Sequence, residues 1–285
     1  MRLNLYRAPL DNDGVVGWSE RWITIWNKRL YRHFDFHLLK SHIQKNADGT
    51  MSLHFSGRWA PISKFIGFMT EIVYTVTKGG NILVDICGTP YGEFAETLPR
   101  IGVVFPMDPQ FSRAMWYGRG EEECYSDRCE HCNFGRYELP VDAMNFRYDI
   151  PQECGTRIHT RFLKIGGLSF VGSDDFSFSY HDFTLSDLIA ARHRNELKKA
   201  DENYLYLDYA MRGLGSYSCG PNPEECYELR AHTFRFAFMI APGAEESELL
   251  ALSRKRFASV TEKLSDTYDH EVTRNYHNIV ECDRD

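Results

Sequence analysis

Alternation of apolar and polar side chains along the chain predicts a protein built mainly from β-strands. Residues 176–180, Phe-Ser-Phe-Ser-Tyr, place every second side chain on one apolar face, as a half-buried strand requires. The stretch 234–240 repeats this period of two, with phenylalanine at its first three alternate positions. Residues 204–211 are a further strand candidate. These stretches predict strands with one buried face.

Glycine-containing turns join neighbouring strand candidates. The β-rich stretches 70–77 and 82–87 are connected by Lys-Gly-Gly-Asn, a good hairpin turn because glycine tolerates positive φ. Asp48-Gly49 marks another turn, between 43–45 and 51–56. Many strands separated by turns favour a large antiparallel sandwich.

Helix signals are few. Residues 18–34 have a mixed periodicity that favours one helix, and Thr184-Leu185-Ser186-Asp187 is a capping-box variant that predicts a helix through about residue 197. No repeat or linker divides the chain, so we expect one β domain over residues 1–243 and a helical extension over 244–285. The extension carries apolar residues that we expect to pack on the domain itself: Leu249, Leu250, Phe257 and Val260.

Composition narrows the class of partner. The 285 residues carry a net charge of −7, which argues against nucleic acid or an anionic membrane as the main partner. No apolar run approaches the roughly 18–20 residues that span a bilayer, and the N-terminus lacks the features of a signal peptide. We therefore expect a cytoplasmic protein, in which the eight cysteines stay reduced.

A cysteine-rich segment is the first candidate for chemistry. Cys124, Cys129, His131 and Cys132 are ligand types that zinc accepts. The spacing contains no pair of CxxC motifs, and adjacent His131 and Cys132 rarely point at one ion. We therefore favour a thiol-bearing loop without a metal.

Acidic and histidine residues give weaker signals. Glu121, Glu122 and Glu123 lie near Asp127, and a glycosidase needs two carboxyl groups about 5–10 Å apart, but acidic runs usually form solvated surfaces. His181 and His193 flank the predicted helix, and either has the chemistry of a general base. No partner arrangement singles out either histidine.

A glycine-rich loop follows the strand candidate 204–211. Residues 213–221, Gly-Leu-Gly-Ser-Tyr-Ser-Cys-Gly-Pro, allow an unusual backbone path. Such a loop either approaches a ligand or another chain, or is simply a tight turn. Composition leaves both readings open.

A set of motifs occurs along the chain in a fixed order: Arg-Ala-Pro-Leu-Asp-Asn-Asp at 7–13, Tyr-Gly-Arg-Gly at 117–120, Glu-x-Tyr-x-Asp-Arg at 123–128, Gly-Arg-Tyr at 135–137, Pro-Gln-Glu-Cys-Gly-Thr-Arg at 151–157, Phe-Ser-Phe-Ser at 176–179, residues 191–197, and the loop 213–221. Read in this order, the motifs resemble one enzyme family: the C-terminal domain of the large bacterial β-galactosidases of glycoside hydrolase family 2. The resemblance covers about residues 4–242.

The resemblance implies a fold and a reaction. The fold is a galactose mutarotase-like supersandwich, all-β and antiparallel with a few short helices. The reaction is hydrolysis of terminal β-D-galactosides with retention, by two glutamates of a TIM-barrel domain that this sequence lacks. The chain is then a subunit or an excised domain, inactive alone, whose partners are the barrel-bearing chain and the β-galactoside. It needs no cofactor of its own, whereas the barrel is expected to use Mg and Na or K.

The resemblance also assigns residue roles. In the family the glycine loop reaches into the active site, so Tyr217, Ser218 and Cys219 are candidate substrate-binding residues. Cys219 stands where some members place a sugar-stacking Trp, and this departure removes that contact. Cys124 and Cys154 stand where the family has Asn, which supports the interpretation without zinc.

Four residues of the 123–128 motif are expected to order a loop and not to touch substrate: Glu123, Tyr125, Asp127 and Arg128. A buried Asp–Arg pair would do this through charge-assisted bonds.

Two other functions are compatible with the fold. One is an aldose 1-epimerase, which would need His193 with an acidic partner. The other is a stand-alone sugar-binding module with no chemistry. Fold-level likeness alone licenses none of the three functions, and the ordered motifs favour the β-galactosidase subunit.

Overall fold

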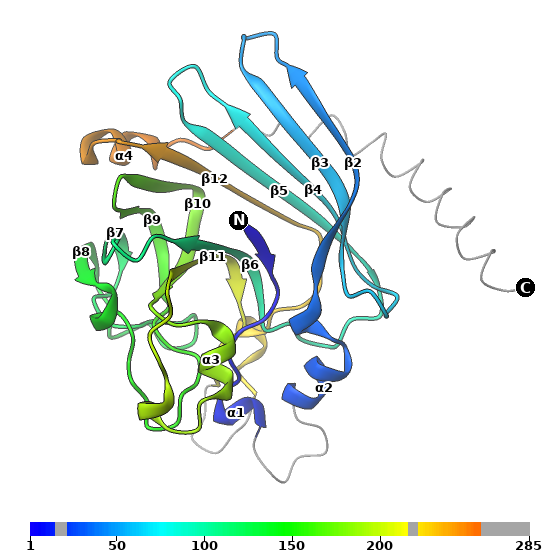
Figure 1. The fold of residues 1–285 in the computed structure, drawn as a ribbon, viewed down its shortest axis with the longest axis vertical. Coiled ribbons are helices and arrows are strands. Elements are labelled where there is room, and N and C mark those ends of the chain that lie inside the picture. The colour runs from blue at the N-terminus through cyan, green and yellow to red at the C-terminus, as the bar shows by residue number, and fades with distance from the viewer. Residues whose placement is uncertain (15–21, 216–221, 258–285) are drawn as a thin grey trace, which may run out of the picture.

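A computed structural model describes residues 1–14, 22–215 and 222–257 of the chain. Figure 1 shows strands that form one long, strongly bent antiparallel array, with the short helices of residues 11–14, 22–28 and 185–190 at one end. The all-β antiparallel fold predicted from the sequence is therefore confirmed.

The strands of the described residues belong to one twelve-stranded sheet with the order β1-β6-β11-β10-β12-β5-β4-β3-β2, and β9, β7 and β8 branch from β10. Figure 1 shows β2–β5 and β7–β10 on the two arms of the bend. The strands are β1 (Arg2–Asn4), β2 (Asp35–Lys45), β3 (Met51–Ala60), β4 (Ile66–Val76), β5 (Ile82–Gly92), β6 (Arg100–Met107), β7 (Arg113–Arg119), β8 (Phe134–Pro140), β9 (Arg157–Ile165), β10 (Leu168–His181), β11 (Asn203–Met211) and β12 (Phe234–Pro242).

Both hairpins predicted from glycine-containing turns are present. β2 pairs with β3 and β4 pairs with β5, each antiparallel. Gly49 and Gly80 have φ angles of 85° and 81°, in the left-handed region that glycine enters without steric cost. The turn residues therefore fix the register of these hairpins, as expected.

The helices are shorter than the sequence pattern suggests. Of the predicted helix 18–34, the structure has α2 (Trp22–Lys28), followed by Leu30 in a left-handed conformation and a 3-10 turn at Tyr31–His33. Residues 18–21 lie outside the described residues. The remaining short helices are α1 (Asp11–Gly14), α3 (Leu185–Ala190) and α4 (Glu246–Leu252).

The start of α3 is as predicted, but its end is not. The Thr184 hydroxyl accepts a hydrogen bond from the Asp187 amide at 3.0 Å, which is the expected cap. The helix ends at Ala190 because Ala191 is extended. The Glu196 carboxylate then holds the Arg192 amide at 2.8 Å, so the prediction of a helix to about residue 197 was wrong.

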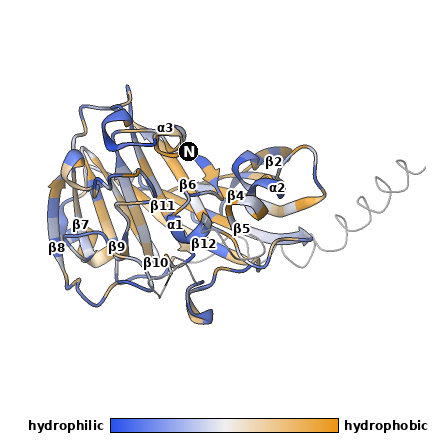
Figure 2. Ribbon diagram, turned by 90° about the horizontal axis from the view of Figure 1, so that it is seen from below, coloured by the Kyte–Doolittle hydropathy of each residue, from blue (hydrophilic) through white to orange (hydrophobic). Residues whose placement is uncertain are grey.

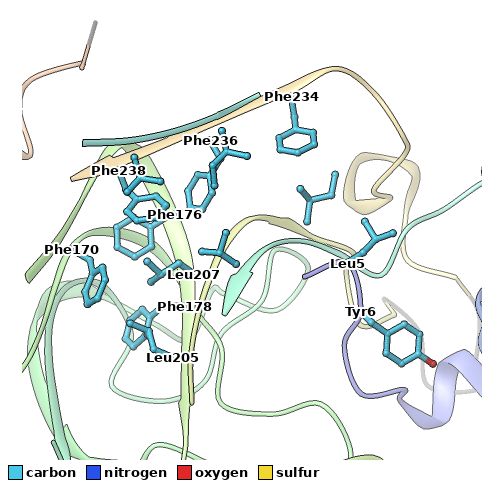
Figure 3. Packing of buried hydrophobic residues seen from close by; sticks show 14 of the residues in the cluster. Leu5, Tyr6, Phe170, Phe176, Phe178, Leu205, Leu207, Phe234, Phe236 and Phe238 are labelled. Carbon is cyan, nitrogen blue, oxygen red and sulfur yellow. The ribbon is translucent and has the colours of Figure 1, made fainter. Parts of the chain in front are cut away.

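The core is rich in phenylalanine from the central strands. Figure 3 shows Phe176 of β10 near Phe236 and Phe238 of β12, and Phe178 of β10 beside Leu205 of β11. Figure 2 shows that hydrophobic segments occur in the strands of both arms. The predicted alternation therefore defines the inner face of the sheet.

The opposite face of β12 is also partly covered. Met239, which points away from the phenylalanine face, is buried in a second cluster with Leu249 of α4. Leu250 and Phe257 pack against the same cluster, so this part of the extension lies on its own sheet as expected. Val260 lies outside the described residues, and the division of the chain at 243/244 stays a prediction.

The helices of the described segments are short. None of them is long and apolar enough to cross a membrane.

Candidate functional site

The structure describes the start of the glycine-rich loop, residues 213–215, and the residues that flank the loop, 212 and from 222 onward. The sequence-predicted substrate-binding residues Tyr217, Ser218 and Cys219 lie outside the described residues. The candidate site is therefore the loop base, which we define as residues 212–215 and 222 with the side chains that bind them.

Asp127 binds the first part of the loop base, residues 212–215. Its Oδ1 accepts a hydrogen bond from the Leu214 amide at 3.0 Å, and its Oδ2 accepts one from the Gly215 amide at 2.8 Å. Hydrogen bonds to an ionised carboxylate are worth about twice as much as neutral ones. A Cβ atom on Gly213 would lie 2.8 Å from Oδ2 of Asp127, so this close approach requires glycine.

A tight turn presents Asp127 to the loop. The amides and carbonyls of Tyr125 and Arg128 bond each other in both directions, at 3.1 and 2.9 Å. The Tyr125 ring is buried and the Arg128 guanidinium lies 5.8 Å from its centroid. The buried tyrosine thus anchors the turn that carries Asp127.

The side chain of Arg212 links the two parts of the loop base. Its guanidinium is 1% exposed and donates two hydrogen bonds to Glu228, both at 2.8 Å. It also donates to Asp13 at 3.1 Å and to Asn222 at 3.1 Å. The fork of guanidinium donors suits this bidentate geometry, and it ties residue 222 to residue 212.

The N-terminal motif completes the loop base. Arg7 pairs with Asp13 at 2.9 Å, and both side chains are fully buried. Asn12 donates to the Leu214 carbonyl at 3.0 Å. These contacts place α1 beside the loop base, at the end of the molecule where Figure 1 shows α1 and α2.

Glu123 is the centre of a second network beside the turn. Its Oε1 accepts from Arg128 at 2.6 Å and from the Tyr148 hydroxyl at 2.5 Å, and its Oε2 accepts from the Gly155 amide at 2.8 Å. Burial together with the bond to Glu123 raises the pKa of Tyr148 to about 12, so its hydroxyl stays a donor.

The expected buried Asp–Arg pair is absent from this motif. Arg128 is 48% exposed and pairs with Glu123, whereas Asp127 binds backbone amides of the loop base. The reason is geometric, because the turn places consecutive residues Asp127 and Arg128 on different sides. All four motif residues still lie in the segment next to the loop base.

Comparison of the chain with known proteins identifies its family. The family model described as "Beta galactosidase small chain" matches residues 1–240. The chain belongs to the β-galactosidase small-chain family. The motif residues of the loop base therefore lie within the region that defines the family.

Full-length β-galactosidases are much longer than this chain. A β-galactosidase of Photobacterium profundum is 29% identical over 254 residues, which are 84% of this chain and 24% of that protein. One of Kluyveromyces lactis is 31% identical over 84% of this chain and 23% of its own length. One of Vibrio cholerae is 38% identical over 79% and 22%. The chain thus spans about a quarter of the length of the relatives it matches.

In the part of the chain that the structure describes, Cys124, Cys129, Cys132 and Cys154 are thiols. Cys124 and Cys132 are buried in one small apolar cluster with Ile158, and burial raises the pKa of Cys124 to about 12. The His131 ring lies 3.2 Å from the Glu123 carbonyl. Within the described segments, no group of three or more His, Cys, Asp or Glu is arranged to hold a metal ion.

Neither candidate histidine lies in an acidic cleft. His181 is buried, bonds Asn145 at 2.6 Å, and has its pKa lowered by burial to about 3. His193 does have an acidic partner, Glu196 at 3.0 Å, but the two side chains are 72% and 48% exposed. This pair lies in a surface 3-10 turn, Arg194–Glu196, an environment that does not favour the epimerase interpretation.

Sequence reasoning missed part of the loop base. Arg7, Asn12 and Asp13 were visible only as a family motif, and Arg212 and Glu228 were not singled out. Arg212 precedes the first glycine of the loop, and a charged residue at the end of an apolar strand is the signal that could have indicated it. Glu228 carries no such signal.

Proposed function

We propose that this chain is a non-catalytic subunit or domain of a cytoplasmic β-galactosidase. Family membership and coverage of only a quarter of the relatives' length support this role. The complete enzyme hydrolyses terminal β-D-galactosides with retention through two glutamates of a TIM-barrel partner. This chain completes that partner's active site and contributes to carbohydrate binding.

The loop 213–221 is the segment that reaches the partner in this proposal. Tyr217, Ser218 and Cys219 then contact the sugar or the leaving group. Asp127 and Arg212 do not touch substrate, and they hold the ends of the loop. They are positioning residues.

The observation that carries the proposal is the set of buried polar groups that hold the loop base. Arg7, Asp13 and Arg212 are each no more than 1% exposed, and their contacts converge on residues 212–215 and 222. Burying charge is costly unless each group is paired. Such a construction suits a loop whose conformation must be set before it meets a ligand.

The decisive experiment measures nitrophenyl-β-galactoside hydrolysis by this chain alone and mixed with a barrel-bearing large chain of the same family. We expect no activity alone and strong activity on mixing. Activity of this chain alone would show that catalytic groups reside here and would overturn the proposal. Inactivity of the mixture, with no complex on size-exclusion chromatography, would reject the role of a complementing subunit and leave an excised domain or a sugar-binding module.

The two alternative functions have a separate readout. An aldose 1-epimerase would accelerate mutarotation of α-galactose without any partner, as polarimetry measures directly. A sugar-binding module would bind galactose alone in calorimetry and leave the mutarotation rate unchanged. We expect neither result for this chain.

A further inference from the structure

A cavity of about 350 Å³ shares no lining residue with the loop base. Its lining comes from three segments: residues 142–154, the connection from β10 into α3, and residues 194–199. Small-molecule sites usually occupy about 300–1,000 Å³. The cavity is therefore large enough for one small ligand.

Backbone hydrogen bonds hold the three walls together. The Arg194 amide donates to the Asp149 carbonyl at 3.0 Å, which joins the first wall to the third. The Ala200 amide donates to the Asp182 carbonyl at 2.7 Å, which joins the third wall to the second. These two main-chain bonds thus link the segments that line the cavity.

The floor of the cavity is apolar. Cys154, Phe183 and Leu188 line it and are buried together in one hydrophobic cluster. Tyr148 and Leu197 also line the cavity and pack against this cluster. A floor of this kind suits the apolar face of a ring.

The rim is basic. Arg147, Arg194, Lys198 and Lys199 line the cavity, and no ion pair or side-chain hydrogen bond to any of them is present among the described residues. Asp142 and Asp182 also line it, so the cationic side chains outnumber the carboxylates by four to two. This local excess stands out on a chain whose net charge is −7.

We propose that this cavity binds a small organic phosphate of the hexose phosphate class. Arginine and lysine side chains are the groups that bind phosphate through charge-assisted hydrogen bonds. Asp142, Asp182 and Gln152 supply acceptors and an amide for sugar hydroxyls. The apolar floor accommodates the ring. The phosphate, the hydroxyl groups and the ring of such a ligand therefore each have a complementary surface.

The inference does not depend on the proposed β-galactosidase role, because binding is measured on the full chain without a partner. Isothermal titration calorimetry with glucose 6-phosphate at low salt is the test. We expect a Kd of about 1 mM or lower, at least tenfold weaker binding of galactose, and displacement by inorganic phosphate. Salt should weaken binding, because the Debye length falls to about 8 Å at physiological ionic strength.

Charge-matched variants locate the site. The double variant Arg194→Gln/Lys198→Gln should bind glucose 6-phosphate at least tenfold more weakly, which is about 1.4 kcal/mol. Lys40→Gln/Lys45→Gln removes two exposed charges from β2 and should bind like the wild type. Circular dichroism verifies that both variants fold.

Three outcomes would reject the site. One is the absence of glucose 6-phosphate binding by the wild type. Another is equal weakening in both double variants, which would indicate only the overall charge of the chain. The third is failure of inorganic phosphate to compete with the wild-type interaction, which needs no variant and therefore stands even if a variant does not fold.

Discussion

The carboxylate oxygen of Asp127 lies 2.8 Å from the backbone amide of Gly215, 88 residues later in the chain. This bond joins the motif at 123–128 to the glycine-rich loop. Two family motifs that are separate in sequence therefore act on one structural element. The relationship gives each motif a physical role that can be tested one residue at a time.

Replacing Asp127 should loosen the loop without unfolding the domain. Asp127→Ala removes both acceptors of the Leu214 and Gly215 amides, and each bond to a charged group is worth about 1.5–3 kcal/mol. We expect the activity of the reconstituted enzyme to fall at least tenfold and amide hydrogen exchange at both positions to accelerate. Asp127→Asn keeps one acceptor and should lie between the wild type and Asp127→Ala.

Asp201→Asn is the matched control for Asp127, since Asp201 is an exposed carboxylate away from the loop base. It should change neither exchange nor activity. Unchanged exchange at Leu214 and Gly215 in Asp127→Ala would contradict the role assigned to the carboxylate.

Gly213→Ala tests the close approach directly. Its Cβ would meet Asp127 Oδ2 at 2.8 Å, Asp127 Cγ at 2.9 Å and Tyr227 Cβ at 3.0 Å, so the carboxylate or the loop must shift. We expect a loss of reconstituted activity similar to that of Asp127→Ala. Gly167→Ala, where nothing lies within 4 Å of the added Cβ, should be silent in the same assay.

Arg212→Met should destabilise the whole chain. It leaves the carboxylates of Asp13 and Glu228 buried, with Glu228 losing both of its bonds to the guanidinium. Breaking a buried pair from one side typically costs about 3–5 kcal/mol, which urea denaturation followed by circular dichroism measures. Arg230→Met removes an exposed pair with Glu225 and should leave the denaturation midpoint almost unchanged. Equal midpoints for the two variants would show that the Arg212 network is not stabilising.

The architecture was predictable because strand alternation and turn chemistry are local. Phe176 and Phe178 lie on the same face of β10 because they are two residues apart, and their apolar rings predict that this face is buried. Gly80 permits its turn because glycine adopts a positive φ without steric cost. Met239 is different, since it is buried together with Leu249 of α4, the helix that follows β12. No pattern within β12 reports that contact.

The loop base was only partly predictable for the same reason. Asp127 could be singled out by resemblance, but its partners are the Leu214 and Gly215 amides, and a backbone amide has no sequence signature. Glu228 was missed because its role is to accept two hydrogen bonds from Arg212, and this contact forms only in the folded chain. The predicted length of α3 was too great. The Arg192 amide donates a hydrogen bond to the Glu196 carboxylate and therefore does not continue the helix.

A third buried charge network makes stability depend on pH. Asp208 is fully buried on β11, 3.2 Å from the Arg100 guanidinium, which also pairs with Glu153 at 3.1 Å. Burial raises the pKa of Asp208 from 3.8 to about 7, against the lowering effect of Arg100. The folded state therefore holds a proton on Asp208 that the unfolded state releases near pH 4.

This protonation stabilises the fold fully below about pH 4, and the stabilisation is lost as pH rises through 7, because the folded chain then binds more protons than the unfolded one. Asp208→Asn mimics the protonated acid and cannot ionise. Its free energy of unfolding relative to the wild type should therefore rise between pH 5 and pH 8 in urea titrations. Asp201→Asn should show no such trend, and a pH-independent difference for Asp208→Asn would mean that Arg100 keeps the carboxylate ionised throughout.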